Sequence, residues 1–429
     1  MATQVGDRMT TSGGMGFGGD VRLEALKKSL LQTVGFAALA GLMSWAGFVS
    51  LKFGWADYRS HQNDLSARLE ALRLTPGDAD AWLRLAELKR EAGQDGRADV
   101  RRAVALNPSN YEALILVGLG EESAGNTSEA EHDLLAAARM DKDYLPRWTL
   151  ANFYFRQGNL DALFQWANDG LVVAVGDVTG LFRLLWTATD DGQRILATIP
   201  EREHVRIQYL TWLTDQGRLA AGVPVAADIV ARWPLSGKDA AVYFVERLAL
   251  KGDVEDATRL WNVLAVRSIV PTRIDPFAGQ SLVNSDFRTA PLNRGLDWHL
   301  ISVDGVRTEF TRPGMRFEFS GHEAEQCDLM QQLSVLAPGR KYRFNYSWEG
   351  RGIEAGTGLR WRIMDAIAGA EITGPTPDIF GSGGNGAFQF AVPQNVGLCR
   401  ISLRYTRRPG TLRIEGWIRI LNTRLSFAE

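Results

Sequence analysis

Arginine and tryptophan side chains recur at alternate positions in two runs near the C-terminus, residues 399–405 and 412–420. The intervening positions are mostly apolar, so we predict a hairpin whose opposite face is polar. Guanidinium groups bind carboxylates and sulfates bidentately, and an exposed indole offers a flat surface to a sugar ring. The face could bind an acidic polymer, although a solvated face with arginine paired across strands to Glu415 explains the same pattern. The glycan-binding residues that this pattern predicts are Arg400, Arg404, Arg413, Trp417 and Arg419.

The two cysteines, Cys327 and Cys399, both fall on the apolar phase of predicted strands. They could form a disulfide in an oxidising compartment, or remain buried as free thiols. Their number and spacing fit neither a disulfide scaffold nor a zinc site, and the five histidines are scattered. A glycine-rich run at residues 381–386 lacks the following helix of a phosphate loop, so we predict a flexible turn there. We therefore expect no catalytic residues, no metal site and no cofactor.

The strands that would carry these side chains lie within residues 280–429, where apolar and polar residues alternate. Clear examples are residues 315–320, 342–348 and 359–364. Strict alternation predicts strands with one face on a core and the other in water. Several such strands separated by glycine and proline turns predict an antiparallel β-sandwich of the jelly-roll kind.

Residues 58–270 instead show the apolar period of helices, and similar segments recur along them. Corresponding residues, such as Gly93, Gly125 and Gly158, are about 32 to 34 positions apart. One helix pair per repeat explains this spacing, with the glycine in a left-handed turn between the two helices. Weaker copies continue to Ala257. We predict an α-solenoid whose concave face holds a peptide or protein partner, unless the solenoid acts only as a spacer.

The uncharged segment at residues 29–51 is long enough, at about 1.5 Å per residue, to cross a hydrocarbon core of about 30 Å. We predict a single transmembrane helix there, after a disordered cytoplasmic tail at residues 1–28. Basic residues on its N-terminal side favour a cytoplasmic N-terminus, with the later domains outside the cytoplasm. A cleaved signal peptide fits less well, because the apolar run is too long and no Ala-x-Ala sequence follows. Small residues at four-residue spacing would permit helix pairing and hence a homo-oligomer.

The 429 residues carry a formal net charge of −2, and 23% of them are charged. These values are typical of globular proteins. A net charge so close to zero gives no global attraction to nucleic acid, so we expect no nucleic-acid partner.

The helical repeats resemble the tetratricopeptide repeat (TPR) family, whose consensus places a tryptophan, a Leu-Gly pair, a tyrosine and an alanine at these offsets. Trp82, Leu114 and Trp148 occupy equivalent positions in the first three units. Lys89 and Glu122 depart from the family pattern, because an aromatic residue is usual at their positions. The resemblance implies a scaffold that binds proteins.

The opening phrase of the C-terminal region, residues 284–298, resembles the first strand of galactose-binding-like jelly rolls, which include many carbohydrate-binding modules. The whole chain is similar to membrane-anchored TPR proteins of bacterial exopolysaccharide machinery. This resemblance implies a non-catalytic scaffold in the bacterial inner membrane, with its solenoid and sandwich in the periplasm, binding protein partners and polysaccharide. Two alternatives stay open: an assembly factor that binds only proteins, and a glycan-active enzyme. The enzyme would need two carboxylates about 5 to 10 Å apart, and no recognisable motif supplies them.

Overall fold

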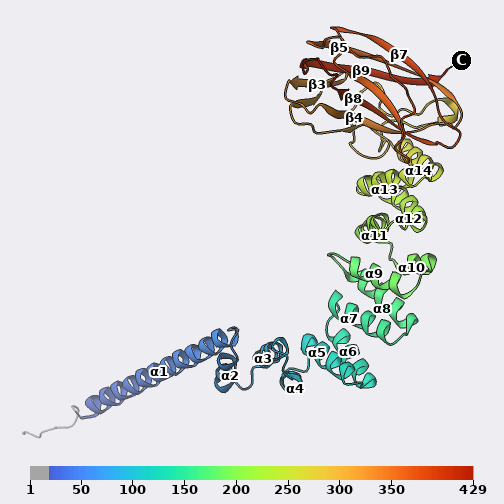
Figure 1. Cartoon of the computed structure of the whole chain (residues 1–429). Helices are drawn as coiled ribbons and strands as arrows, with labels where there is room; N and C mark the ends of the chain where they lie inside the picture. The colour runs from blue at the N-terminus through green and yellow to red at the C-terminus, as the bar shows by residue number, and fades with distance from the viewer. Residues whose placement is uncertain (1–18, 429) are drawn as a thin grey trace, which may run out of the picture. The chain divides into compact units, whose positions relative to one another are not determined.

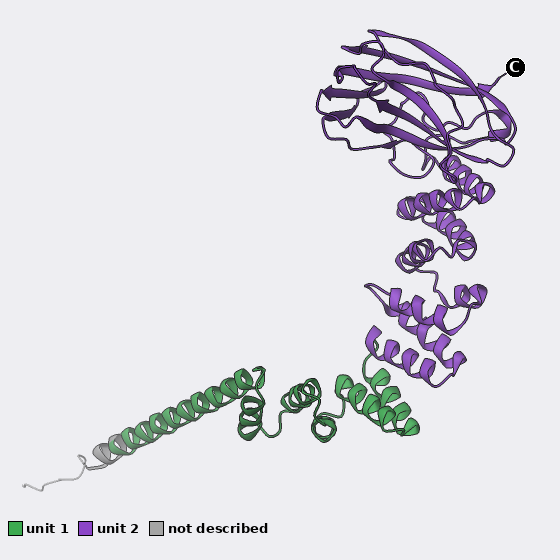
Figure 2. Cartoon of the chain, in the orientation of Figure 1, with its two compact units in different colours: residues 1–142 green, residues 143–429 purple. Residues whose placement is uncertain are grey.

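The computed structural model describes residues 19–428, which form two compact units divided after residue 142 (Figure 2). The first unit contains helices only, and the second contains further helices followed by all the described strands (Figure 1). Residues 1–18 of the disordered tail expected at residues 1–28 lie outside the described residues, and the expectation is wrong for residues 19–28, which belong to helix α1.

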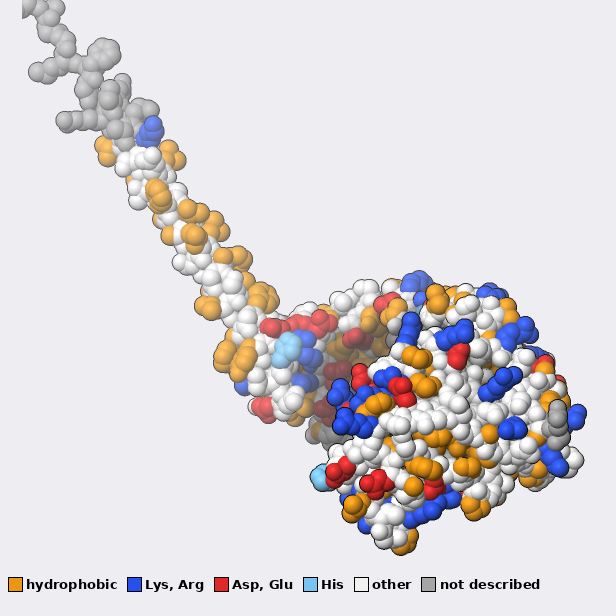
Figure 3. Space-filling view, turned by 90° about the horizontal axis from the view of Figure 1, so that it is seen from above, with side chains coloured by type: hydrophobic (Ala, Val, Ile, Leu, Met, Phe, Trp, Pro, Cys, Tyr) orange, Lys and Arg blue, Asp and Glu red, His pale blue; other side chains and the backbone are white. Residues whose placement is uncertain are grey.

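Helix α1 (Gly19–Ser60) has two distinct parts. In the first, the leucine and phenylalanine side chains between residues 26 and 53 are more than half exposed, and Figure 3 shows apolar side chains along the visible face of the helix. By length and composition, residues 26–60 form a candidate membrane span. The last turns instead pack on helix α2 (Leu65–Leu74), where Ala56 is buried. The exposed apolar segment and the turns that pack on α2 therefore belong to one continuous helix.

The helices after α1 pack mainly on their neighbours in the chain, as a TPR-like α-solenoid requires. Gly93, Gly125 and Gly158 have φ angles of 71°, 85° and 71°, so the predicted left-handed turns are confirmed. These helices are α3 (Ala79–Glu91), α4 (Arg97–Leu106), α5 (Tyr111–Ser123), α6 (Thr127–Met140), α7 (Tyr144–Arg156), α8 (Leu160–Val173), α9 (Thr179–Ala188), α10 (Gly192–Thr198), α11 (Glu203–Asp215), α12 (Leu219–Arg232), α13 (Lys238–Leu250) and α14 (Val254–Val266).

Helices α9 and α10 form a pair that the glycine pattern does not predict. Their connection contains no glycine, and the carboxylate of Asp191 caps α10 by accepting hydrogen bonds from the amides of Gln193 and Arg194. A side-chain cap therefore begins the second helix of this pair. Elsewhere, Lys89 replaces the usual aromatic residue and forms a 2.6 Å ion pair with Asp99 of α4.

The C-terminal region is an antiparallel sandwich of two sheets, as predicted. The four-stranded sheet has the order β1-β4-β8-β6, and the five-stranded sheet has the order β2-β3-β9-β5-β7. The strands are β1 (His299–Leu300), β2 (Val306–Phe310), β3 (Met315–Ser320), β4 (Gln326–Val335), β5 (Lys341–Arg351), β6 (Leu359–Asp365), β7 (Gly383–Ala391), β8 (Leu398–Thr406) and β9 (Glu415–Phe427).

Aromatic side chains from both sheets fill the space between them. Trp361 of β6 contacts Trp298 and Phe344, with ring centroids 5.9 and 5.0 Å apart. All three side chains are buried, as are Phe317 and Tyr405. The apolar phases predicted for β3, β5 and β6 therefore do face the core. Burial of these rings supplies much of the force that holds the sheets together.

A β-bulge changes the phase of β4. Its pairing with β8 shifts between Asp328 and Met330, so Leu329 and Met330 are both buried although they are adjacent. Simple alternation places Leu329, Leu333 and Val335 on one face, which is wrong. Leu333 lies opposite Arg400, on the outer face of the sheet.

The predicted hairpin of residues 399–405 and 412–420 is also wrong. Strand β8 belongs to the four-stranded sheet, whereas β9 lies in the five-stranded sheet between β3 and β5. Both strands direct apolar side chains into the shared core, for example Ile401 and Ile418. Because the two sheets enclose that core from opposite sides, their polar faces point away from each other.

Residues 383–386 form the start of β7, where we expected a flexible turn. They pair with residues 346–349 of β5. A Cβ on Gly386 would lie 2.3 Å from the Tyr346 ring, and one on Gly384 would lie 3.2 Å from Trp348. The glycines therefore leave room for two aromatic rings of the neighbouring strand.

The sandwich packs directly on the last helix pair of the solenoid. The amide of Gly295 donates a 2.8 Å hydrogen bond to Glu246 of α13. Asn262 of α14 makes two 2.8 Å hydrogen bonds with the backbone of Ile274, in the connection that leads to the sandwich. Trp261 is fully buried beside this connection and donates to the carbonyl of Thr272. The junction is packed structure rather than a free linker.

Candidate functional site

The structure does not bring the five tentative glycan-binding residues together. Arg400 and Arg404 lie on the outer face of the four-stranded sheet, half-buried. Trp417 and Arg419 lie on β9 in the opposite sheet, and Arg413 is exposed in the connection before β9. Two separate faces are therefore available for a ligand.

On the five-stranded sheet, Trp417 is already covered by a neighbouring cation. The guanidinium of Arg316 lies 4.3 Å from the centroid of the Trp417 ring, and that of Arg419 lies 5.9 Å away. Arg419 also forms a 2.6 Å ion pair with Glu349 of β5. Cross-strand pairing of arginine and glutamate thus occurs on this face, with Glu349 in place of the expected Glu415.

On the four-stranded sheet, the sequence pattern did not single out two further arginines. Arg360 of β6 lies directly opposite Arg404, and Arg362 lies opposite Ser402. Both alternate with the buried residues of β6, so the signal was present in the sequence, but only the strand order places them beside β8. Arg404 donates to Asp328 at 3.2 Å and to Gln326 at 3.1 Å.

The two cysteines are free thiols, and the disulfide hypothesis for this pair is wrong. In the ladder between β4 and β8, Cys327 lies opposite Tyr405 while Cys399 lies opposite Ser334. Six residues of strand separate these positions, or about 20 Å, whereas a disulfide requires Cα atoms within about 7 Å. Burial raises the pKa of the Cys327 thiol to about 11 and that of Cys399 to about 12. Both thiols are therefore neutral at physiological pH.

A groove of about 870 Å³ lies where α14 meets the sandwich. Its walls come from α14, from the connection that follows this helix, and from the turn between β4 and β5. Arg259 and Arg273 line it together with Glu255 and Asp275, so its charges are balanced, and the Phe277 side chain is 81% exposed. A groove with apolar and charged walls has the features of a binding site for a small ligand or peptide.

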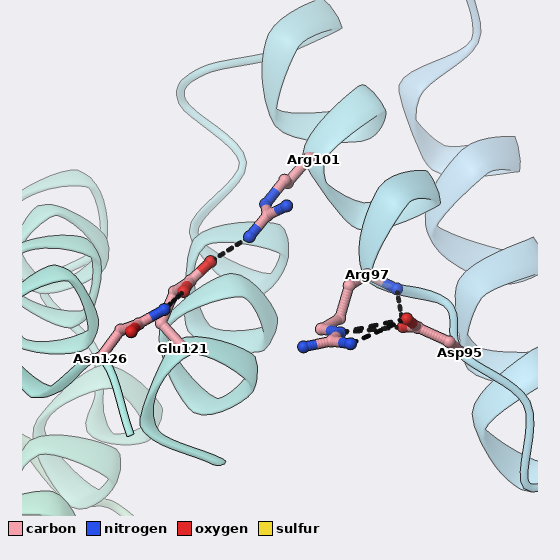
Figure 4. Close-up of polar contacts among 5 residues, drawn as sticks. All are labelled: Asp95, Arg97, Arg101, Glu121 and Asn126. Atoms are coloured by element: carbon pink, nitrogen blue, oxygen red, sulfur yellow. Dashed lines mark hydrogen bonds and ion pairs between the residues drawn. The ribbon is translucent and has the colours of Figure 1, made fainter. Parts of the chain in front are cut away.

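In the first unit, a chain of polar contacts links three helices of the solenoid (Figure 4). Arg101 of α4 contacts Glu121 of α5, which also accepts a 2.7 Å hydrogen bond from Asn126. These two contacts hold the pKa of Glu121 below its usual range, with the Asn126 hydrogen bond as the larger cause. Nearby, Arg97 lowers the pKa of Asp95 to about 2. These groups stay charged over the physiological range and fix the connections between helices.

A buried carboxyl group holds the loop that opens the sandwich. Asp297 is fully buried and accepts hydrogen bonds from the amides of Leu292 and Trp298, at 3.0 and 2.8 Å. Burial raises the pKa of Asp297, although these hydrogen bonds oppose the rise. Its contacts are with its own loop, so its role is structural. Within residues 19–428, no group of three or more His, Cys, Asp and Glu side chains is arranged to hold a metal ion.

The solved structures similar to this chain include a protein described as CBM4 and several TPR proteins. The protein described as CBM4 has 14% identity and a TM-score of 0.27, covering 34% of this chain and 100% of its own. YrrB, a TPR protein with an unusual peptide-binding site, has 15% identity and a TM-score of 0.25, covering 47% and 93%. PilW, a type IV pilus biogenesis factor, has 14% identity and a TM-score of 0.28, covering 44% and 94%. No protein-family model and no curated protein matches the chain.

The described chain therefore combines a candidate membrane helix, a TPR-like α-solenoid and an antiparallel two-sheet β-sandwich. The similarities to solved structures concern this fold alone.

Proposed function

We propose that the protein is a non-catalytic scaffold of the bacterial cell envelope, anchored in the cytoplasmic membrane by residues 29–51. The observation that carries this proposal is the bare apolar part of α1, which continues without interruption into the packed helix pair of α1 and α2. So many exposed leucine and phenylalanine side chains on one helix would be unstable in water but suit a bilayer. Lys52 and Trp55 follow the apolar segment, as expected at a membrane interface.

We further propose that the N-terminus is cytoplasmic and that the solenoid and sandwich are periplasmic. In this arrangement the solenoid binds protein partners and the sandwich binds polysaccharide, in exopolysaccharide assembly or export. Arg400 and Arg404 would contact the glycan from the four-stranded sheet, with Arg413, Trp417 and Arg419 as a second contact on the other side.

Membrane anchoring can be tested with paired charge substitutions. Replacing Leu39 and Leu42 with arginine should release the protein from membranes washed at high pH, because two charges at the bilayer centre are costly. Replacing the exposed Val175 and Leu235 of the solenoid with arginine should leave it in the membrane fraction. Release of both variants, or of neither, contradicts anchoring by α1.

Topology can be tested with single engineered cysteines and a membrane-impermeant maleimide on intact spheroplasts. In a Cys327→Ser, Cys399→Ser background, which removes the half-buried and the buried native thiol, a cysteine at exposed Ala355 should be labelled, and one at Ser12 should react only after lysis. The reverse pattern contradicts the periplasmic assignment. Binding of alginate and dextran to the purified full chain tests the glycan part of the proposal. If neither polymer binds and only protein partners are recovered, the sandwich is not a glycan receptor.

A further inference from the structure

The outer face of the four-stranded sheet carries four half-buried arginines on two adjacent strands. Arg360 and Arg362 lie on β6, and Arg400 and Arg404 lie on β8. The register places Arg360 directly opposite Arg404, with like charges about 5 Å apart at the Cβ atoms. Like charges in directly opposite positions destabilise a sheet, so this arrangement needs another source of stabilisation.

Only one of the four arginines has its charge balanced by the sandwich itself. Arg404 pairs with Asp328, whereas no described residue forms an ion pair or hydrogen bond with the side chains of Arg360, Arg362 and Arg400. The Nε atoms of Arg362 and Arg400 are buried and have no acceptor among the described residues. A buried donor without an acceptor costs free energy, so the sandwich does not stabilise these two guanidinium groups by itself.

Two acidic side chains near these arginines already have partners of their own. Asp378 beside β6 forms a 2.7 Å ion pair with Arg408. Asp365, at the end of β6, accepts hydrogen bonds from two amides of its own turn. The five-stranded sheet differs, since its half-buried Arg419 pairs with Glu349 and Arg316 lies on an indole. Unbalanced, half-buried positive charge thus distinguishes the outer face of the four-stranded sheet.

We propose that this face binds an acidic polysaccharide, whose carboxylates are held by Arg360, Arg362 and Arg400. The proposal rests on the glycan-binding part of the proposed function and assigns the class of glycan and its site. Three planar guanidinium groups suit carboxylates, which accept two parallel hydrogen bonds from each. Half-buried Gln331 of β4 lies opposite Ser402 in the register and offers an amide group to sugar hydroxyls.

An acidic chain is favoured over a folded protein by the composition of the face. Protein interfaces have a largely apolar core enriched in aromatic residues. Between the four arginines the strands carry Ser402 and Met364, with no aromatic side chain on the outward phase. The positive charge also follows two neighbouring strands that run side by side. Outward-facing positions recur about every 7 Å along each strand, which suits a linear polymer.

The test measures binding of the full chain in detergent to alginate, with dextran as the neutral polymer and poly-glutamate as an acidic peptide. The triple variant Arg360→Gln, Arg362→Gln, Arg400→Gln should bind alginate at least about 30-fold more weakly. Each lost guanidinium–carboxylate contact weakens binding by roughly tenfold, so three independent contacts would give about 1,000-fold, and neighbouring contacts add less than fully. The control replaces exposed Arg307, Arg343 and Arg424 of the other sheet with glutamine, which removes the same charge.

The control should keep alginate affinity within about twofold, and the triple variant should unfold at the same or a higher temperature, because it loses repulsion and no internal ion pair. Equal weakening in both variants would mean that net charge alone attracts the polymer, and would overturn the site. Equal or tighter binding of poly-glutamate would overturn the polysaccharide assignment. Unchanged alginate binding in the triple variant would refute this site but leave the proposed function intact, whereas no binding of either polymer to the unmodified chain would refute both.

Discussion

Substituting Gly295 should loosen the junction between the solenoid and the sandwich. Gly295 has a φ angle of 69°, and a Cβ there would lie 2.7 Å from Val242 and 2.9 Å from the Trp261 ring. The left-handed backbone costs an alanine about 1–2 kcal/mol, and overpacking two buried side chains costs about 1–3 kcal/mol more. We therefore expect Gly295→Ala to destabilise the junction by about 2–5 kcal/mol.

The matched control is Gly356→Ala. Gly356 also has a positive φ angle, 83°, but a Cβ there would have no atom within 4 Å. Its substitution should cost only the backbone contribution, about 1–2 kcal/mol. The difference between the two variants isolates the effect of packing against α13 and α14.

Hydrogen exchange is the suitable assay, because a chain with two units need not unfold in one step. Amides of α13 and α14 should exchange roughly 5- to 150-fold faster in Gly295→Ala, which corresponds to the packing contribution of about 1–3 kcal/mol. Gly356→Ala should leave them unchanged. Equal exchange in these helices for the two variants would refute the packed junction.

Four further results follow from the structure. Arg206 is buried and donates to the carbonyls of Pro200 and Ile199 at 3.1 and 2.8 Å, so Arg206→Met should cost about 2–4 kcal/mol in urea unfolding. Asp191→Ala should cost about 1 kcal/mol by removing the cap of α10, and Asp191→Asn should restore most of it. Without reductant, two thiols per chain should react with Ellman's reagent in urea, and buried Cys399 should not react before unfolding; a disulfide would give no reaction at all. Burial raises the pKa of Tyr209 to about 12, so the unfolded chain ionises first and stability should fall as pH rises from about 10 to 12, less steeply in Tyr209→Phe.

Local periodicity predicted most of the helices and strands of this fold. Helical and strand periods depend on neighbouring residues, so α-helix pairs and most strands of the sandwich could be assigned from the sequence. The glycines between helices were predictable for the same reason, since Gly93 and its equivalents end a helix where only a left-handed turn fits. The helix pair of α9 and α10 was not predicted, because the N-cap residue Asp191, rather than a glycine, precedes its second helix.

The candidate site was less predictable because it depends on which strands are neighbours. Alternation showed that Arg400 and Trp417 point outward, but not that they do so on opposite sides of the core. The same lack of pairing information made a disulfide between Cys327 and Cys399 plausible, although the ladder separates them. The sequence did not indicate that Arg360 lies opposite Arg404, because that requires β6 to be the neighbour of β8. Strand order depends on contacts between distant parts of the chain, which no local pattern encodes.

Both junctions described within the units are packed, and this limits how the parts can move. At the first, Arg59 of α1 pairs with Glu70 of α2 at 2.7 Å, so the first helix pair is held to the helix that bears the apolar segment. At the second, Glu246 and Trp261 hold the sandwich on α13 and α14. A ligand on the sandwich would therefore have a fixed position relative to the last helices. Because the groove beside α14 has walls from both bodies, its shape depends on the same contacts, and loosening Gly295 should alter the groove while leaving the arginine face of the four-stranded sheet intact.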